Sequence, residues 1–77
     1  MARWKIELRN LGANRGGETV IVNAENLVKA KQHAMRMSRR HLSGGGGIYF
    51  EARGHYRYSI ILGMDEVGEA SITCVEA

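Results

Sequence analysis

The sequence predicts an α+β fold in which an antiparallel-rich sheet carries a single helix on one face, with the element order β-β-α-β-β-β. Three observations indicate this fold. Two segments before residue 25 either alternate apolar and polar side chains or are rich in β-branched residues, as strands are. The segment after Asn26 repeats its apolar side chains at a helical period. Three more strand-like segments follow, separated by short glycine-containing stretches.

Length and composition bound the architecture. The 77 residues are expected to form one domain, 1–77, around one small core. An apolar fraction of 44% and a charged fraction of 25% are those of a folded, soluble protein. The longest apolar run is Ile60-Ile61-Leu62, so no membrane span is expected, and the alternating N-terminus does not resemble a signal peptide. The one cysteine cannot form an internal disulfide, which fits a reducing cytoplasm.

The first two strands are expected at residues 4–9 and 19–22. In the first, Trp4, Ile6 and Leu8 alternate with charged residues and are expected to face the core. The second is the β-branched run TVIV. Residues 12–17 between them include several residues able to take positive φ, three of them glycines, which predicts a long hairpin loop.

The helix is expected to begin after Asn26, whose side chain suits an N-cap. Its apolar stripe comprises Leu27, Ala30, Ala34, Met37 and His41, widened by Val28, Met35 and Leu42. Its opposite face comprises Lys29, Gln32, His33, Arg36, Arg39 and Arg40. Lys31 lies near the border, where its stem can cover apolar surface, and Gly44 suits the position just after a helix.

The last three strands are expected at residues 48–53, 56–62 and 70–75. Gly54-His55 predicts a two-residue type II′ hairpin turn between the first two of them. Residues 63–68 are expected to form an acidic loop. Cys74 lies in the last strand, where a lone cysteine is expected to be a small buried side chain. An unpaired edge strand of such a sheet could join two copies of the chain.

Charge is distributed unevenly. Between Asn26 and Phe50 the chain carries no acid and five basic residues, which are Lys29, Lys31, Arg36, Arg39 and Arg40. The net charge is +3, although every charged residue in the segment 63–77 is acidic. Such asymmetry predicts a surface that binds a polyanion or an acidic protein face. Two simpler explanations stay open: a solvated surface without a partner, and stabilisation of the helix dipole by Arg39, Arg40 and His41.

Catalytic patterns are poorly represented. His33 and His41 are eight positions apart, so they do not form the helical i, i+4 pair of a zinc site. Residues 44–47 are four glycines that follow a helix and lack the Lys-Ser/Thr of a P-loop. Cys74 and the adjacent acids Asp65-Glu66 suggest neither a nucleophile nor a metal site. We therefore expect no enzyme activity, no metal and no cofactor.

The candidate partner-binding residues come from the helix and from the hairpin that follows it: Lys29, Arg36, Arg39, Arg40, Arg53 and Arg57. Aromatic residues interleave with the hairpin arginines, namely Tyr49, Phe50, Tyr56 and Tyr58. Such aromatics either stack on bases or fill the core. The sequence lacks the signatures of RRM, KH, zinc-finger and helix-turn-helix modules.

Residues 20–34, VIVNAENLVKAKQHA, resemble a pattern of small phage and mobile-element proteins. In that pattern a strand of alternating valines runs through a buried alanine into an Asn- or Ser-capped helix with alanines four apart. Several small anti-CRISPR proteins are similar in size, in this strand–helix join and in their antiparallel sheet. The resemblance covers about 15 of 77 residues and transfers no functional residue by position. It implies a non-enzymatic protein that acts by surface contact with a CRISPR effector complex.

The sequence therefore predicts a small, cytoplasmic interaction protein of the anti-CRISPR kind, made by a phage or mobile element. Its basic surface would bind an effector complex and block target DNA binding. The alternative is a general nucleic-acid-binding module, for DNA or RNA, that uses the same basic helix face. An enzyme or a metal site is the third and least supported hypothesis.

Overall fold

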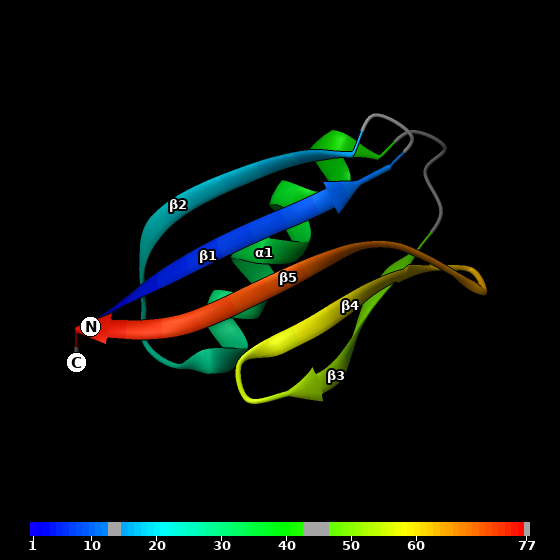
Figure 1. The fold of residues 1–77 in the computed structure, drawn as a ribbon. Coiled ribbons are helices and arrows are strands. Elements are labelled where there is room, and N and C mark those ends of the chain that lie inside the picture. Colours follow the sequence, from blue (N-terminus) through cyan, green and yellow to red (C-terminus); the bar gives the residue numbers. More distant parts are fainter. Residues whose placement is uncertain (13–14, 43–46, 77) are drawn as a thin grey trace.

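A computed structural model describes residues 1–12, 15–42 and 47–76 of the chain. In these residues one helix packs against a five-stranded antiparallel sheet, which confirms the predicted α+β fold (Figure 1). The elements in chain order are β1 (Ala2–Leu11), β2 (Gly16–Ala24), α1 (Leu27–His41), β3 (Ile48–Gly54), β4 (Arg57–Leu62) and β5 (Asp65–Glu76).

The first and last strands lie side by side in the sheet. The strand order is β2-β1-β5-β4-β3, so β1 pairs with β2 on one side and with β5 on the other. Ile6 thus lies between Val20 and Ile72. The start of β1 and the end of β5 lie side by side, where Arg3 is opposite Glu76 (Figure 1). The outer strands of the sheet are β2 and β3.

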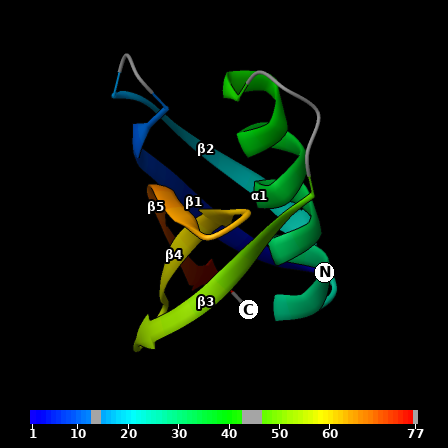
Figure 2. The ribbon, with the colours of Figure 1, turned by 90° about the vertical axis from the view of Figure 1, so that its right-hand side faces the viewer.

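The core lies between the sheet and the helix, and the other face of the sheet carries no second layer of described residues (Figure 2). Trp4, Ile6 and Leu8 are buried on the helix side, as their alternation with charged residues predicted. Ala30 and Ala34 are fully buried, and these small side chains let α1 lie close on the sheet. The indole nitrogen Nε1 of Trp4 donates a hydrogen bond to the carbonyl of Ala24, 3.2 Å away, where β2 ends.

The helix begins as predicted, but its apolar stripe is narrower than expected. The side-chain Oδ1 of Asn26 accepts a hydrogen bond from the backbone N–H of Lys29 at 3.0 Å. Val28 is 63% exposed, because it lies roughly 130° around the helix from the buried alanines. Ser38, which was not part of the predicted stripe, is buried instead. Its hydroxyl donates a hydrogen bond to the Ala34 carbonyl at 2.8 Å. The predicted helix end at Gly44 lies outside the described residues.

The predicted acidic loop at residues 63–68 is wrong. Gly63 adopts a φ of +67°, which permits a tight turn of Gly63 and Met64, and β5 already begins at Asp65. The pairing of β4 with β5 shifts after Ile60, which lies opposite Gly68, whereas Ile61 lies opposite Glu66. This β-bulge interrupts the alternation of side chains, and it explains why the strand was not recognised over its full length.

The predicted type II′ turn at Gly54-His55 is also wrong. The left-handed residue of this hairpin is Tyr56, with a φ of 61°, and Gly54 belongs to β3. The pairing of β3 with β4 shifts between Ala52 and Gly54, which places an extra residue, Arg53, on β3. The bulge moves the turn one residue along the chain, so that His55 and Tyr56 form its tip.

Candidate interaction surface

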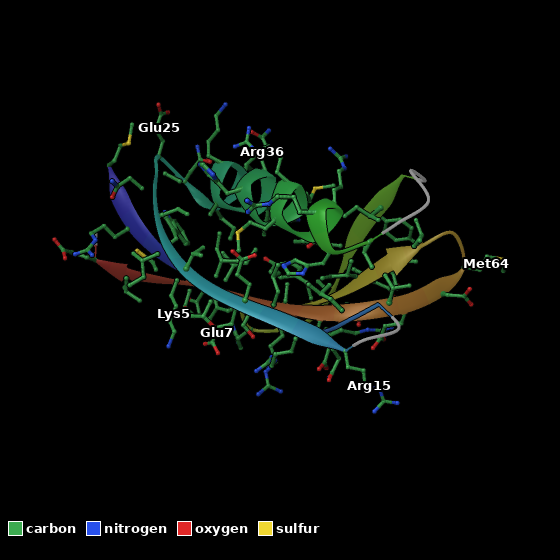
Figure 3. All side chains as sticks on the ribbon, turned by 90° about the horizontal axis from the view of Figure 1, so that it is seen from above. Lys5, Glu7, Arg15, Glu25, Arg36 and Met64 are labelled. Carbon is green, nitrogen blue, oxygen red and sulfur yellow. The ribbon has the colours of Figure 1, made fainter. Side chains whose placement is uncertain are left out.

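Basic side chains cover the side of α1 that points away from the sheet. We call this surface the helix face, and its members are Lys29, Gln32, His33, Arg36, Arg39 and Arg40. Helical periodicity groups them on one side of α1, because positions three and four apart lie above one another. Lys29, Arg36, Arg39 and Arg40 are all exposed. Figure 3 shows Arg36 above the helix, whereas Lys5 and Glu7 extend from the opposite side of the sheet.

The positive charge of the helix face is not neutralised within the described part of the chain. Neither Lys29 nor any of the three arginines has an ion-pair partner there, and α1 itself contains no acid. The nearest polar contact is with a neighbour on the same face, because Nη2 of Arg36 lies 3.3 Å from Nδ1 of His33. This surface is therefore a concentrated source of positive potential.

Lys31 behaves differently from the other basic residues of α1. Its Nζ lies 5.0 Å from the ring centroid of Tyr58 in β4, in a cation–π contact. The side chain lies along the border of the helix, as the sequence predicted, and contributes its charge from the flank that points towards β4.

Two shallow depressions flank Arg36. One is lined by His33, Arg36, Met37 and Arg40. The other is lined by Gln32, Met35, Arg36 and Arg39. Each is lined by one methionine and two arginines, so it can accept the aliphatic or planar part of a ligand beside an anionic group. These depressions were not predicted from the sequence.

The first depression lies on the flank of α1 that contains Met37. His41 belongs to the same flank of α1 as Met37, four residues earlier, and its Nε2 lies 3.0 Å from Oε1 of Glu18 in β2. His41 was expected in the apolar stripe, but the residue is exposed and its imidazole contacts the Glu18 carboxylate. The second depression opens towards the opposite flank, where Lys31 covers Tyr58.

The sheet face that points away from α1 carries charges of both signs in pairs, and we call it the open sheet face. Lys5 Nζ lies 3.5 Å from Oε1 of Glu7 along β1. Nη2 of Arg9 donates to the hydroxyl of Ser71 at 2.9 Å. At the end of the sheet, Arg3 forms an ion pair with Glu76 at 3.2 Å. Two of these contacts, those of Lys5 and Arg3, pair the cation with an acid, whereas Arg9 meets a neutral hydroxyl.

Arg53 and Arg57 lie on the open sheet face and not beside the helix face. Arg53 Nε donates to Ser59 Oγ at 2.8 Å, and this hydroxyl donates to Glu66 Oε1 at 3.0 Å. Arg57 lies opposite Ser71, which itself lies opposite Glu7. The six predicted partner-binding residues therefore form two surfaces, because adjacent strand positions in register project to the same side of a sheet.

The aromatic residues are not placed for stacking beside the helix face. Phe50 and Tyr58 pack together in the core layer, with ring centroids 6.0 Å apart. Tyr49 and Tyr56 are exposed, but Tyr49 lies opposite Ile61 on the open sheet face and Tyr56 lies at the hairpin tip. Tyr56 does not fill the core, which was one of its two expected roles.

Cys74 is exposed, so its predicted burial is wrong. It lies opposite Trp4, but β4 begins opposite Ser71, so no strand of the described residues flanks Cys74 on its other side. Among residues 1–12, 15–42 and 47–76, no three His, Cys, Asp or Glu side chains group as a metal site would require.

Comparison with known proteins gives no family for this chain. No protein-family model, no curated protein and no solved structure matches it. In the described part of the chain, α1 has neither the length nor the apolar composition that a membrane-spanning helix requires.

Proposed function

We propose that the protein binds the phosphate backbone of a nucleic acid through its helix face. The observation that carries this proposal is the contrast in pairing: the arginines and the lysine of the helix face have no acidic partner among the described residues, whereas Arg3, Lys5 and Arg53 do. A folded protein of this composition holds enough acids to neutralise a helix. Among the described residues none of these acids forms an ion pair with Lys29, Arg36, Arg39 or Arg40, which leaves their charge available to a partner.

The chemistry of the helix face fits phosphate oxygens. A guanidinium presents donors in a planar fork that matches a phosphate, and three of the four exposed cations are arginines. Lys29 and Arg40 are eleven positions apart, which corresponds to about 16 Å along a helix. That length spans several phosphates of a strand. With no exposed aromatic on this face, the contacts would be sequence-tolerant.

Fluorescence anisotropy of labelled DNA and RNA, measured over a series of salt concentrations, tests the proposal. Four phosphate contacts predict a slope of log affinity against log salt of about −3 to −4 for duplex DNA. Replacing Arg36, Arg39 and Arg40 by Gln should reduce this slope to about −1 and lower the affinity at least about tenfold at low salt.

The matched control removes the same charge from the other side of the molecule. Replacing Arg3, Lys5 and Arg57 by Gln leaves the helix face intact and should change the slope by less than about one unit. Equal losses of affinity in both triple variants would show that binding depends only on net charge and not on the helix face. Wild-type protein that does not bind any nucleic acid at low salt would rule out the proposal.

A second candidate function uses the same surface against a protein. An inhibitor of the anti-CRISPR kind would place the helix face on an acidic patch or in the DNA channel of an effector complex. One of the depressions beside Arg36 favours this candidate, because the partly exposed Met35 in its lining adds an apolar contact that a phosphate backbone does not need. An affinity pull-down with and without nuclease separates the two: a nuclease-resistant, stoichiometric protein complex supports the inhibitor, and nuclease-sensitive recovery supports nucleic-acid binding.

A further inference from the structure

The two outer strands of the sheet differ in how their free edges are protected. β3 carries Glu51 and Arg53, and a bulge distorts its pairing near the end. Charges and bulges on an edge strand oppose pairing with another strand. β2 pairs with β1 in unbroken register from Glu18 to Ala24, and residues 19–24, TVIVNA, carry no charge, no proline and no glycine. No strand of the described residues occupies the outer side of β2.

The free edge of β2 suits a strand of the same sequence. Antiparallel self-pairing centred on Val20 places Thr19 opposite Ile21 of the second copy, and pairing centred on Ile21 places the two Ile21 side chains opposite each other. Both registers place β-branched residues opposite one another, and such cross-strand pairs stabilise a sheet. In neither register does Glu18 lie opposite Glu18 of the second copy. Ile21 is 52% exposed on the open sheet face, and the pairing would cover it.

From this edge we infer that β2 is a homodimer interface, at which two copies of the chain pair antiparallel to form one continuous ten-stranded sheet. The two-fold axis of such a pair is perpendicular to the sheet, so both helices lie on the same side of it. The depression lined by His33, Arg36, Met37 and Arg40 lies on the flank of α1 whose His41 contacts Glu18 of β2. In the dimer the two copies of this depression flank the axis from both sides and form one basic site.

This arrangement links dimerisation to ligand binding. Two helix faces on one side repel each other when no anion is present, and an anion that contacts both relieves the repulsion. Dimerisation therefore rises with salt, which screens the repulsion, and with bound polyanion. This last link rests on the proposed function, whereas the interface itself does not.

Sedimentation velocity at about 0.5 M salt, where surface charges are screened, tests the interface without any nucleic acid. Wild-type protein is expected to sediment as a dimer, and Ile21→Lys as a monomer, because a lysine on an edge strand opposes pairing. The control Val75→Lys replaces another exposed β-branched residue, 49% exposed on β5, and should sediment as wild type. Circular dichroism confirms that each variant is folded.

A disulfide trap gives an independent measurement. In a Cys74→Ser background, oxidised Ile21→Cys should form a covalent dimer in the register centred on Ile21, oxidised Val20→Cys in the register centred on Val20, and Val75→Cys in neither. Monomeric wild-type protein at several protein concentrations, or an Ile21→Lys variant that dimerises like wild type, overturns the inference. Nucleic-acid binding by a monomeric Ile21→Lys variant would still support the proposed function, and a dimer that does not bind nucleic acid would support the interface alone.

Discussion

The helix face and the open sheet face both carry basic side chains, but they differ in whether these side chains have acidic partners. α1 holds five basic residues and no acid, whereas the rest of the chain holds six basic residues against eight acids. On the open sheet face these charges form pairs such as Lys5 with Glu7 and Arg53 with Glu66. On the helix face, Lys29 and the three arginines have no such partner among the described residues.

The difference separates the charges that contribute to folding from those that are available for binding. Exposed ion pairs typically stabilise a protein by about 0–1 kcal/mol each, so neither face determines the stability of the fold. That stability comes from the layer of side chains between α1 and the sheet. This layer holds the arginines of the helix face at fixed spacing. The helix face itself contributes little to the stability of the fold.

The largest effect is expected from a change beneath the helix face. Ala34 is 0% exposed between α1 and the sheet, so Ala34→Leu must push the helix outward and should lower the free energy of unfolding by about 1–3 kcal/mol. Gln32→Leu places a leucine on the exposed side of the same helix and should change the free energy of unfolding by less than about 0.5 kcal/mol. Urea unfolding measures both. Similar stabilities for the two variants would mean that α1 does not sit closely on the sheet.

A smaller effect is expected within the charge network of the open sheet face. Ser59 is 4% exposed and links Arg53 to Glu66, so Ser59→Ala removes an acceptor and a donor at once. We expect a loss of about 1 kcal/mol in the free energy of unfolding, measured by urea denaturation. Ser71→Ala, whose hydroxyl contacts Arg9 at an exposed position, should lose less than about 0.5 kcal/mol. A larger loss for Ser71→Ala would show that burial is not what makes the Ser59 network matter.

The sequence predicted the parts of the fold that depend on local patterns. Strict alternation identified the buried side of β1, and the Asn26 cap identified the start of α1. The predictions that were wrong concern segments in which the two-residue alternation of a strand is interrupted. The bulge between Ile60 and Ile61 in the pairing with β5 hid half of that strand, and the bulge at Arg53 moved the hairpin turn.

The candidate site was predicted in part, for a related reason. Helical periodicity depends only on neighbouring residues, so the helix face could be assigned from the sequence. Whether Arg53 and Arg57 share that face depends on the register of β3, β4 and β5, which long-range pairing decides. The exposure of Cys74 likewise follows from where β4 begins relative to β5, and nothing near Cys74 in the sequence signals it.

The smallest expected effect bears most directly on the contrast between the two faces. Arg39 and Arg40 lie in the last turn of α1, where a positive charge favours the helix dipole, so folding alone accounts for them. Lys29 lies in the first turn, which contains no acid, and there the same dipole disfavours a positive charge. Its amide already donates to Asn26, and a glutamate at this position would complete a capping box.

Lys29→Glu should therefore stabilise the protein by about 0.5 kcal/mol while it weakens nucleic-acid binding. Arg39→Glu should weaken binding as well but destabilise the protein by a similar amount, because it reverses a favourable charge at the other end of the helix. Thermal unfolding at low salt measures the stabilities, and anisotropy measures the affinities. A lysine that lowers stability but raises affinity is positioned for a partner. If Lys29→Glu instead leaves the affinity unchanged, Lys29 is a solvated side chain and the binding surface begins further along α1.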